Sequence, residues 1–248
     1  MIQIITGKLG AGKTLWSVTQ MYDVLTQGRT VVTNIDLDWD FLVKLARRHR
    51  RVVLDPRQLI RIDPANNRNW QEDVPFADPF SPLEVWLDEI HLFYNARDWQ
   101  KSGQECGELF SFLTQSRKAG VNVSFIVQDE ATLEKQFRMQ AEWLMYVVSS
   151  DHMSIAALGK LPFKFFFLVK RSAKTGNLLG KKPYPYNRKF FGAYKTHSFL
   201  DPYMRKLSEN KPRIQKMKLE RISVLRWVWE SIAENTMSIV KRLHPLHK

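Results

Sequence analysis

The apolar positions of this chain fall into short runs that alternate with amphipathic stretches. Short apolar runs rich in valine, isoleucine and phenylalanine predict buried strands, whereas apolar residues three and four positions apart predict helices. Strands that alternate with helices favour a parallel sheet covered on both faces. The runs that predict strands are residues 2–6, 29–35, 83–89, 121–127, 143–149 and 163–170, and the stretches that predict helices are residues 15–21, 40–49, 107–118 and 131–138.

Between these elements lie two segments with a different character. Residues 55–82 are rich in proline, aspartate and asparagine and predict a loop, within which residues 59–62 fit an edge strand. Residues 184–203 are aromatic and contain prolines without a clear period. We expect them to form irregular structure that wraps around the core.

The last part of the chain returns to a helical pattern. Its apolar residues follow a seven-residue repeat, which predicts a helix of about three heptads that either packs on its own domain, pairs with a neighbour or lies on a membrane surface. We therefore predict an α/β domain over residues 1–200 and a basic linker with an amphipathic helix over residues 201–248. The residues of the repeat are Ile222, Leu225, Trp229, Ile232, Ile239 and Leu243.

The positive charge of the chain is concentrated in one block. The net charge is +13, and residues 160–218 contain 16 Lys/Arg and 2 Asp/Glu, so this block carries +14 and the rest −1. Such a block predicts an anionic partner, either single-stranded DNA or the headgroups of an anionic membrane. The alternative is a basic face that only confers solubility. The one cysteine, Cys106, excludes an intrachain disulfide, and we expect neither a secretory signal nor a transmembrane segment in this chain.

The sharpest motif is the phosphate loop at residues 7–14, which reads G-x-x-x-x-G-K-T. A strand is predicted before it and a helix after it, and this context supports the motif. The backbone N–H groups of such a loop and the N-terminus of the helix bind phosphate oxygens. Lys13 is expected to reach the β- and γ-phosphates, and the Thr14 hydroxyl to ligate Mg²⁺. The predicted nucleotide-binding residues are Gly7, Lys8, Gly10, Ala11, Gly12, Lys13, Thr14 and Leu15.

A second motif supplies the carboxylates that hydrolysis needs. The apolar run at residues 83–89 ends in Asp88 and Glu89, and the carboxyl end of a parallel strand faces the ligand crevice. We expect Asp88 to bind the metal through water and Glu89 to act as the general base on the attacking water. The alternative is that this pair only caps a helix after a buried strand.

Further polar residues are candidates for catalysis. Gln128 follows a predicted strand and is expected to sense the γ-phosphate or orient water, and Arg97 and Arg117 are candidate arginine fingers. For each arginine, an ordinary ion pair at a loop or helix end is an equally good reading. Lys8 resembles the lysine with which some dimerising ATPases reach into the partner's site, but Leu9 stands where those proteins have glycine.

Taken in order, these motifs resemble the cytoplasmic ATPase domain of the filamentous-phage assembly proteins, the gene I products of the zonular occludens toxin (Zot) family. The resemblance covers about residues 1–200. The matching segments are Thr6–Leu15, Thr33–Leu37, Leu87–Glu89 with Asn95–Trp99, Arg117–Gly120, Ile126–Asp129 and Phe191–Thr196.

The resemblance implies an ATP- and Mg²⁺-dependent motor on the cytoplasmic side of the host inner membrane, which drives phage assembly and extrusion. It also implies a homo-oligomer with the phage coat protein and an outer-membrane secretion channel as partners. Two alternatives stay open: a soluble DNA-translocating or packaging ATPase, and a nucleotide-gated assembly scaffold with little turnover. One departure concerns the region after residue 219, where family members usually carry a transmembrane helix and this chain has a charged amphipathic pattern.

Overall fold

The computed structural model describes residues 1–94, 103–150 and 165–195, which all belong to one compact unit, Met1–Leu207. Its centre is an eight-stranded sheet with the strand order β3-β2-β4-β5-β1-β6-β7-β8. The first six strands in this order are parallel, and β7 and β8 are antiparallel to their neighbours. The strands are β1 (Ile2–Thr6), β2 (Val31–Thr33), β3 (Leu59–Arg61), β4 (Leu83–Asp88), β5 (Val121–Ile126), β6 (Trp143–Ser149), β7 (Phe165–Ser172) and β8 (Leu178–Pro185).

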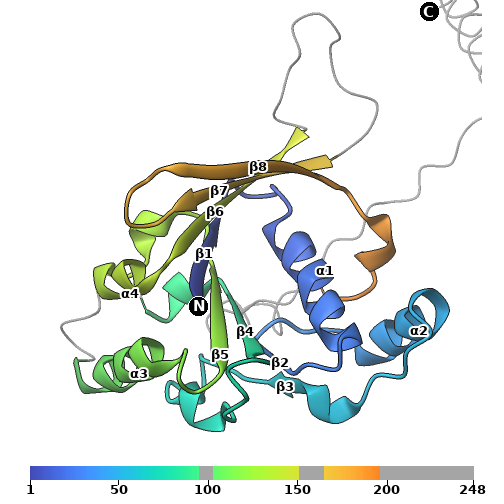
Figure 1. Ribbon diagram of the computed structural model, residues 1–248, viewed down its shortest axis with the longest axis horizontal. Helices are drawn as coiled ribbons and strands as arrows, with labels where there is room; N and C mark the ends of the chain where they lie inside the picture. Colours follow the sequence, from blue (N-terminus) through green and yellow to red (C-terminus); the bar gives the residue numbers. More distant parts are fainter. Residues whose placement is uncertain (95–102, 151–164, 196–248) are drawn as a thin grey trace, which may run out of the picture. The chain divides into compact units, whose positions relative to one another are not determined.

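Helices cover both faces of the sheet and bury two hydrophobic clusters. Figure 1 shows α1 and α2 on one side of the sheet and α3 and α4 on the other. Leu15, Met21 and Leu42 belong to the cluster on the α1 side, whereas Leu109 and Phe137 belong to the cluster on the α3 side. Because both faces are buried, the central strands have nearly continuous apolar sequences. The helices are α1 (Lys13–Thr26), α2 (Trp39–His49), α3 (Gly103–Gln115) and α4 (Lys135–Gln140).

The sequence pattern located most of these elements correctly. The predicted mainly parallel sheet flanked by helices is confirmed, and β3 lies at the edge of the sheet, as residues 59–62 suggested. Residues 186–195 contain one short 3₁₀ helix, Arg188–Phe190, and otherwise irregular structure. The predicted C-terminal helix lies outside the described residues, and the predicted domain boundary at residue 200 stays a prediction.

Strand β8 is the main element that the pattern missed. Its sequence, LLGKKPYP, contains glycine, prolines and lysines that are unfavourable inside a sheet. These residues are tolerated because β8 is an edge strand, where one side of the backbone needs no partner and where charge and proline discourage further pairing. The local sequence therefore gave little sign of a strand whose formation depends on β7.

The strand order brings several loops to one edge of the sheet. Strand β5 lies between β1 and β4, and all three run in parallel, so their carboxyl ends meet. In open α/β sheets this edge holds the ligand crevice.

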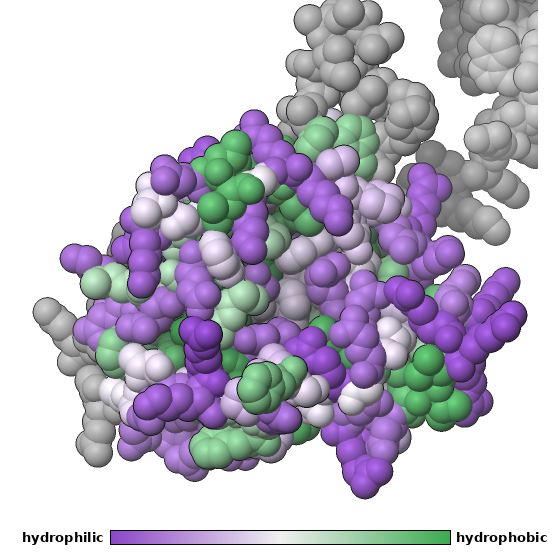
Figure 2. Space-filling model, viewed as in Figure 1, coloured by the Kyte–Doolittle hydropathy of each residue, from purple (hydrophilic) through white to green (hydrophobic). Residues whose placement is uncertain are grey.

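Figure 2 shows that the face in view is mainly hydrophilic, with hydrophobic side chains in small separate groups. Among the described residues, no helix combines the length and the apolar character needed to traverse a bilayer.

Candidate nucleotide-binding site

The loop between β1 and α1 has a backbone that its glycines alone can adopt. Gly12 has a φ of 88°, and a Cβ atom there would lie 2.3 Å from Cε1 of Phe166. At Gly7, which also has a positive φ, a Cβ atom would lie 2.4 Å from the carbonyl oxygen of Val147. Side chains at these positions would therefore both strain the backbone and collide with strands β6 and β7.

The helix that follows the loop presents its N-terminus to the same place. Gly12 is the N-cap of α1, and no side-chain hydrogen bond and no acidic residue of the first turn caps this end. The first N–H groups of a helix have no partner within the helix, so they are available to an anion. Ala11 and Leu15 are buried and hold the loop and the first turn against the core. Phosphate oxygens fit this arrangement.

Lys13 is the first residue of α1, and its side chain reaches back to the start of the loop. Its Nζ donates hydrogen bonds to the carbonyl oxygens of Gly7, at 2.7 Å, and Lys8, at 3.3 Å. Burial lowers the pKa of Lys13, while the nearby carboxylates of Glu89 and Asp88 oppose this shift. A cation held by backbone oxygens beside these carboxylates gains a stronger partner when a phosphate enters the loop.

Thr14 and Asp88 join the phosphate loop to strand β4. The Thr14 hydroxyl donates a hydrogen bond of 2.9 Å to Oδ2 of Asp88. Burial raises the pKa of Asp88 to about 6, and the charge of Glu89 adds to this rise, whereas the Thr14 hydrogen bond and Lys13 lower it. A carboxylate and a hydroxyl that converge beside a phosphate site are ligands that Mg²⁺ accepts together with phosphate oxygens and waters.

Asn34 holds the end of β4 in place. Its side-chain amide donates to the Asp88 carbonyl at 2.9 Å, and its Oδ1 accepts a hydrogen bond from the Asp88 N–H at 2.7 Å. Asn34 follows β2, the neighbour of β4 in the sheet. It belongs to the Thr33–Leu37 segment of the family resemblance, but the sequence did not indicate this contact with the Asp88 peptide.

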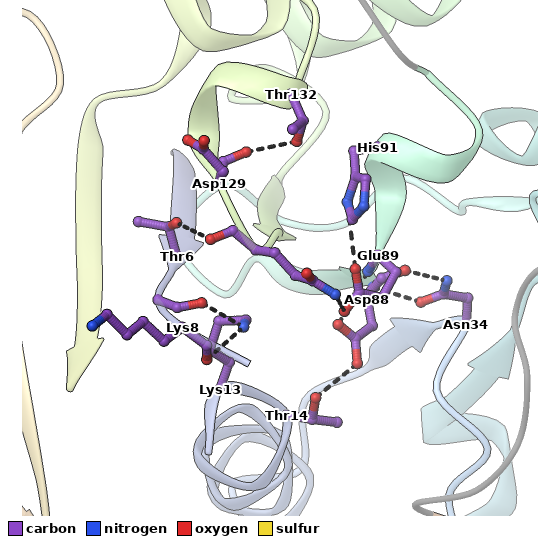
Figure 3. A network of polar contacts seen from close by, with 12 residues as sticks. Thr6, Lys8, Lys13, Thr14, Asn34, Asp88, Glu89, His91, Asp129 and Thr132 are labelled. Atoms are coloured by element: carbon purple, nitrogen blue, oxygen red, sulfur yellow. Dashed lines mark hydrogen bonds and ion pairs between the residues drawn. The ribbon is translucent and has the colours of Figure 1, made fainter. Parts of the chain in front are cut away.

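Glu89 lies beside Asp88 and faces two polar side chains. Oε2 of Glu89 is 3.4 Å from Nδ1 of His91, and Oε1 accepts a hydrogen bond of 3.4 Å from Nε2 of Gln128. Thr6 at the end of β1 donates to the carbonyl oxygen of Gln128 at 3.1 Å, which ties β1 to the turn after β5. Figure 3 shows Thr14, Asp88, Glu89 and Asn34 drawn together above the start of α1.

The backbone at Glu89 is unusual. Its φ of 51° is positive, a conformation that non-glycine residues adopt rarely and that costs about 1–3 kcal/mol. This turn places the carboxylates of two consecutive residues at the same crevice. His91 was not a sequence candidate, because a single histidine two residues after a carboxylate has no characteristic spacing.

Two sequence candidates, Lys8 and Arg117, do not join this cluster within one chain. Lys8 is exposed, and its side chain points away from the carboxylates in Figure 3. Arg117 lies in the turn between α3 and β5, where the Gly120 N–H donates to its carbonyl oxygen and its charge acts on the N-terminal amine of Met1. That is the opposite edge of the sheet, about 17 Å from the loop for a five-residue strand. A role for either residue across a subunit boundary stays a prediction, and Arg97 lies outside the described residues.

Comparisons with known proteins found a family and several relatives that this chain resembles. The family profile described as zonular occludens toxin (Zot) matches residues 1–199. The Gene 1 protein of Enterobacteria phage I2-2 is 29% identical over 165 residues, which cover 64% of this chain and 43% of that protein. The Gene 1 protein of Escherichia phage If1 is 30% identical over 168 residues, which cover 64% of this chain and 45% of that protein. These matches therefore span less than half the length of the relatives.

Solved structures with a similar arrangement were also found. The N-terminal domain of zonular occludens toxin from Neisseria meningitidis has a TM-score of 0.47 and 19% identity, with 78% of this chain and 98% of that chain covered. The genome packaging NTPase B204 from Sulfolobus turreted icosahedral virus 2, in complex with ATP-gammaS, has a TM-score of 0.45 and 12% identity, with 75% and 98% covered.

Proposed function

The chain belongs to the zonular occludens toxin family, and we propose that its α/β domain is an ATP-hydrolysing motor for the assembly and extrusion of a filamentous phage. One observation carries this proposal. The Thr14 hydroxyl and the Asp88 carboxylate are hydrogen-bonded at 2.9 Å between the phosphate loop and the end of β4, with Glu89 directly beside them. A loop that only bound phosphate would not need carboxylates at this position.

Each residue of the site then has a distinct role. The N–H groups of residues 7–15 bind the phosphates, and Lys13 exchanges its backbone partners for the β- and γ-phosphate oxygens. Thr14 and Asp88 would hold Mg²⁺, which would supply positive charge beside the phosphates. Glu89 takes a proton from the attacking water, and Gln128 orients Glu89 and that water.

The described part of the basic block supports an anionic partner for the motor. Residues 165–195 contain eight Lys/Arg and no acidic residue. Most of these cations lie on β7, on β8 and in the segment that follows, and their exposed members are Arg171, Lys174, Lys181, Lys182, Arg188, Lys189 and Lys195. We propose that this surface contacts anionic lipid headgroups, each cation contributing about 1 kcal/mol near a bilayer.

The family resemblance supplies the setting. We propose that the chain acts as a homo-oligomer on the cytoplasmic side of the host inner membrane, with the phage coat protein and an outer-membrane secretion channel as partners. An arginine such as Arg97 or Arg117, or Lys8, would then complete the site of a neighbouring subunit.

ATP hydrolysis by the purified chain tests the proposal directly. We expect Mg²⁺-dependent phosphate release that Lys13→Ala and Glu89→Gln abolish, with Lys44→Ala and Glu108→Gln as exposed controls that leave it intact. Anionic liposomes are expected to stimulate the reaction. Stimulation by single-stranded DNA alone would indicate a DNA-translocating ATPase, and a slow rate that neither ligand changes would indicate a nucleotide-gated scaffold. Equal turnover in the wild type and both site variants would refute the catalytic assignment.

A further inference from the structure

The end of β8 and the segment after it form an aromatic strap, which we define as residues 184–195. It begins beside α1, where the Tyr184 hydroxyl accepts a hydrogen bond of 3.2 Å from Nε2 of Gln20. It ends at the loop between β2 and α2, where the Asp38 N–H donates to the Ala193 carbonyl at 2.9 Å and Lys195 forms an ion pair of 2.8 Å with Asp36. Figure 1 shows this segment descending from β8 past α1 towards α2.

The strap packs closely on α2, and Tyr194 within it lies near Asp88 of the nucleotide site. Gly192 lies so near α2 that a Cβ atom would be 2.7 Å from Cε2 of Phe41. Burial raises the pKa of Tyr194 to about 12, and the charges of Tyr186 and Asp88 add to the rise. The strap therefore passes within electrostatic reach of the carboxylate that we assign to Mg²⁺.

Three aromatic rings form a continuous row that starts at the phosphate loop. Phe166 of β7 contacts Gly12, the N-cap residue of α1. The centroid of Tyr186 is 5.0 Å from that of Phe166, and the centroid of Phe191 is 5.3 Å from that of Tyr186. Phe191 at the end of the row is 47% exposed, whereas its neighbour Phe190 is buried against Tyr22.

An exposed aromatic ring in a well-anchored strap calls for an explanation, because packing would favour turning it inward. The row begins at the loop that takes the phosphates and leads to solvent, which is the course that the ribose and base of a bound nucleotide need. We propose that Tyr186 and Phe191 form the stacking surface for the nucleobase. This inference rests on the proposed function, since it extends the same phosphate site.

The chemistry of the row also sets its selectivity. Stacking on an aromatic ring is worth about 1–3 kcal/mol per base and tolerates every base, because each base has a π-face. Affinity should therefore depend on the presence of a base much more than on its identity. Inorganic tripolyphosphate, which carries the phosphates without a base, separates the two contributions.

The test measures the affinity of the full chain for ATP and for tripolyphosphate, both with Mg²⁺, by calorimetry. We expect the wild type to bind ATP more tightly than tripolyphosphate. Phe191→Ala should weaken ATP binding about tenfold and leave tripolyphosphate binding unchanged, whereas Phe191→Tyr should restore ATP binding. The matched control is Phe80→Ala, because Phe80 is a 97% exposed ring outside the site.

The outcomes distinguish this inference from the proposed function. Unchanged ATP affinity in Phe191→Ala would overturn the inference, and so would an equal loss for both ligands, which would indicate damage to the phosphate site. A wild type that binds ATP and tripolyphosphate equally well would also overturn it, while nucleotide binding itself would stand. A wild type that binds neither ligand would refute the proposed function together with the inference.

Discussion

Strand β4 carries a buried carboxylate near each end, and the two have very different surroundings. Glu84 is 8% exposed and Asp88 is 7% exposed. At the amino edge of the sheet, Glu84 accepts hydrogen bonds from Arg29, at 2.6 Å, and from Asn122, at 2.9 Å. At the carboxyl edge, Asp88 accepts from the Thr14 hydroxyl and the Glu89 N–H, and within the described residues no cation forms an ion pair with it.

This difference separates a carboxylate that supports the fold from one that we propose binds a ligand. A buried charge is stable when a cation and hydrogen bonds compensate for the loss of water, which is the situation of Glu84. Asp88 lacks a paired cation, and burial raises its pKa to about 6. The Mg²⁺ of a bound nucleotide would supply the missing positive charge. Without that ligand, the ionised form of Asp88 is energetically unfavourable.

The strongest test of the comparison exchanges each carboxylate for its amide. We expect Asp88→Asn to lower the rate of phosphate release about 10³-fold, because the metal and the water lose their preorganised electrostatic partner. Glu84→Gln should leave the rate per folded molecule unchanged. Initial rates at saturating Mg-ATP measure both effects. A retained rate above about a tenth of the wild type in Asp88→Asn would contradict the assignment of Asp88.

The pH dependence of stability gives a second test in the absence of nucleotide. The folded pKa of Asp88, about 6, lies above its unfolded value of 3.8. The native protein therefore holds a proton that the unfolded chain has released, so this stabilisation is complete below about pH 4 and is lost as the pH rises through 6. We expect a loss of about 3 kcal/mol in the free energy of unfolding across this window.

Urea denaturation measures this loss as the difference between the wild type and Asp88→Asn at several pH values. The difference cancels the groups that do not interact with Asp88, so it reports Asp88 together with its electrostatic neighbours Glu89 and Lys13. A difference that does not change with pH would mean that the charge of Asp88 is already compensated, as it is at Glu84.

The two ends of β4 also show which features of the candidate site could be predicted from the sequence. The G-x-x-x-x-G-K-T motif and the Asp88-Glu89 pair located the site, because local spacing and the parallel sheet together determine where they meet. The contact of Asn34 was missed because it depends on the pairing of β2 with β4, and that of His91 because it depends on the turn that gives Glu89 its φ of 51°. Arg117 looked similar to the site residues in sequence, but it precedes β5 instead of following it, and it therefore lies at the other edge.

The amino edge offers a test with a smaller effect. We expect Glu84→Gln to lower the free energy of unfolding by about 2 kcal/mol, because the Arg29 guanidinium loses its carboxylate and keeps only the Pro82 carbonyl oxygen. Chemical denaturation near neutral pH measures the change. Asp88→Asn should not reduce stability under the same conditions, since it removes a buried charge that no ion pair compensates. A larger loss of unfolding free energy in Asp88→Asn than in Glu84→Gln would mean that Asp88, and not Glu84, is the carboxylate that stabilises the fold.

The side-chain amides at the two edges provide the smallest and most specific test. Asn34 holds the Asp88 peptide and Asn122 holds the Glu84 carboxylate, so each fixes one end of β4. We expect Asn34→Ala and Asn122→Ala to destabilise the fold similarly, by about 1 kcal/mol. Only Asn34→Ala should also reduce turnover, by about tenfold, because a displaced Asp88 is poorly placed for the metal while the phosphate loop still binds nucleotide. Parallel measurements of unfolding, ATP affinity and phosphate release separate these effects, and an equal loss of turnover in both variants would show that strand position alone governs the site.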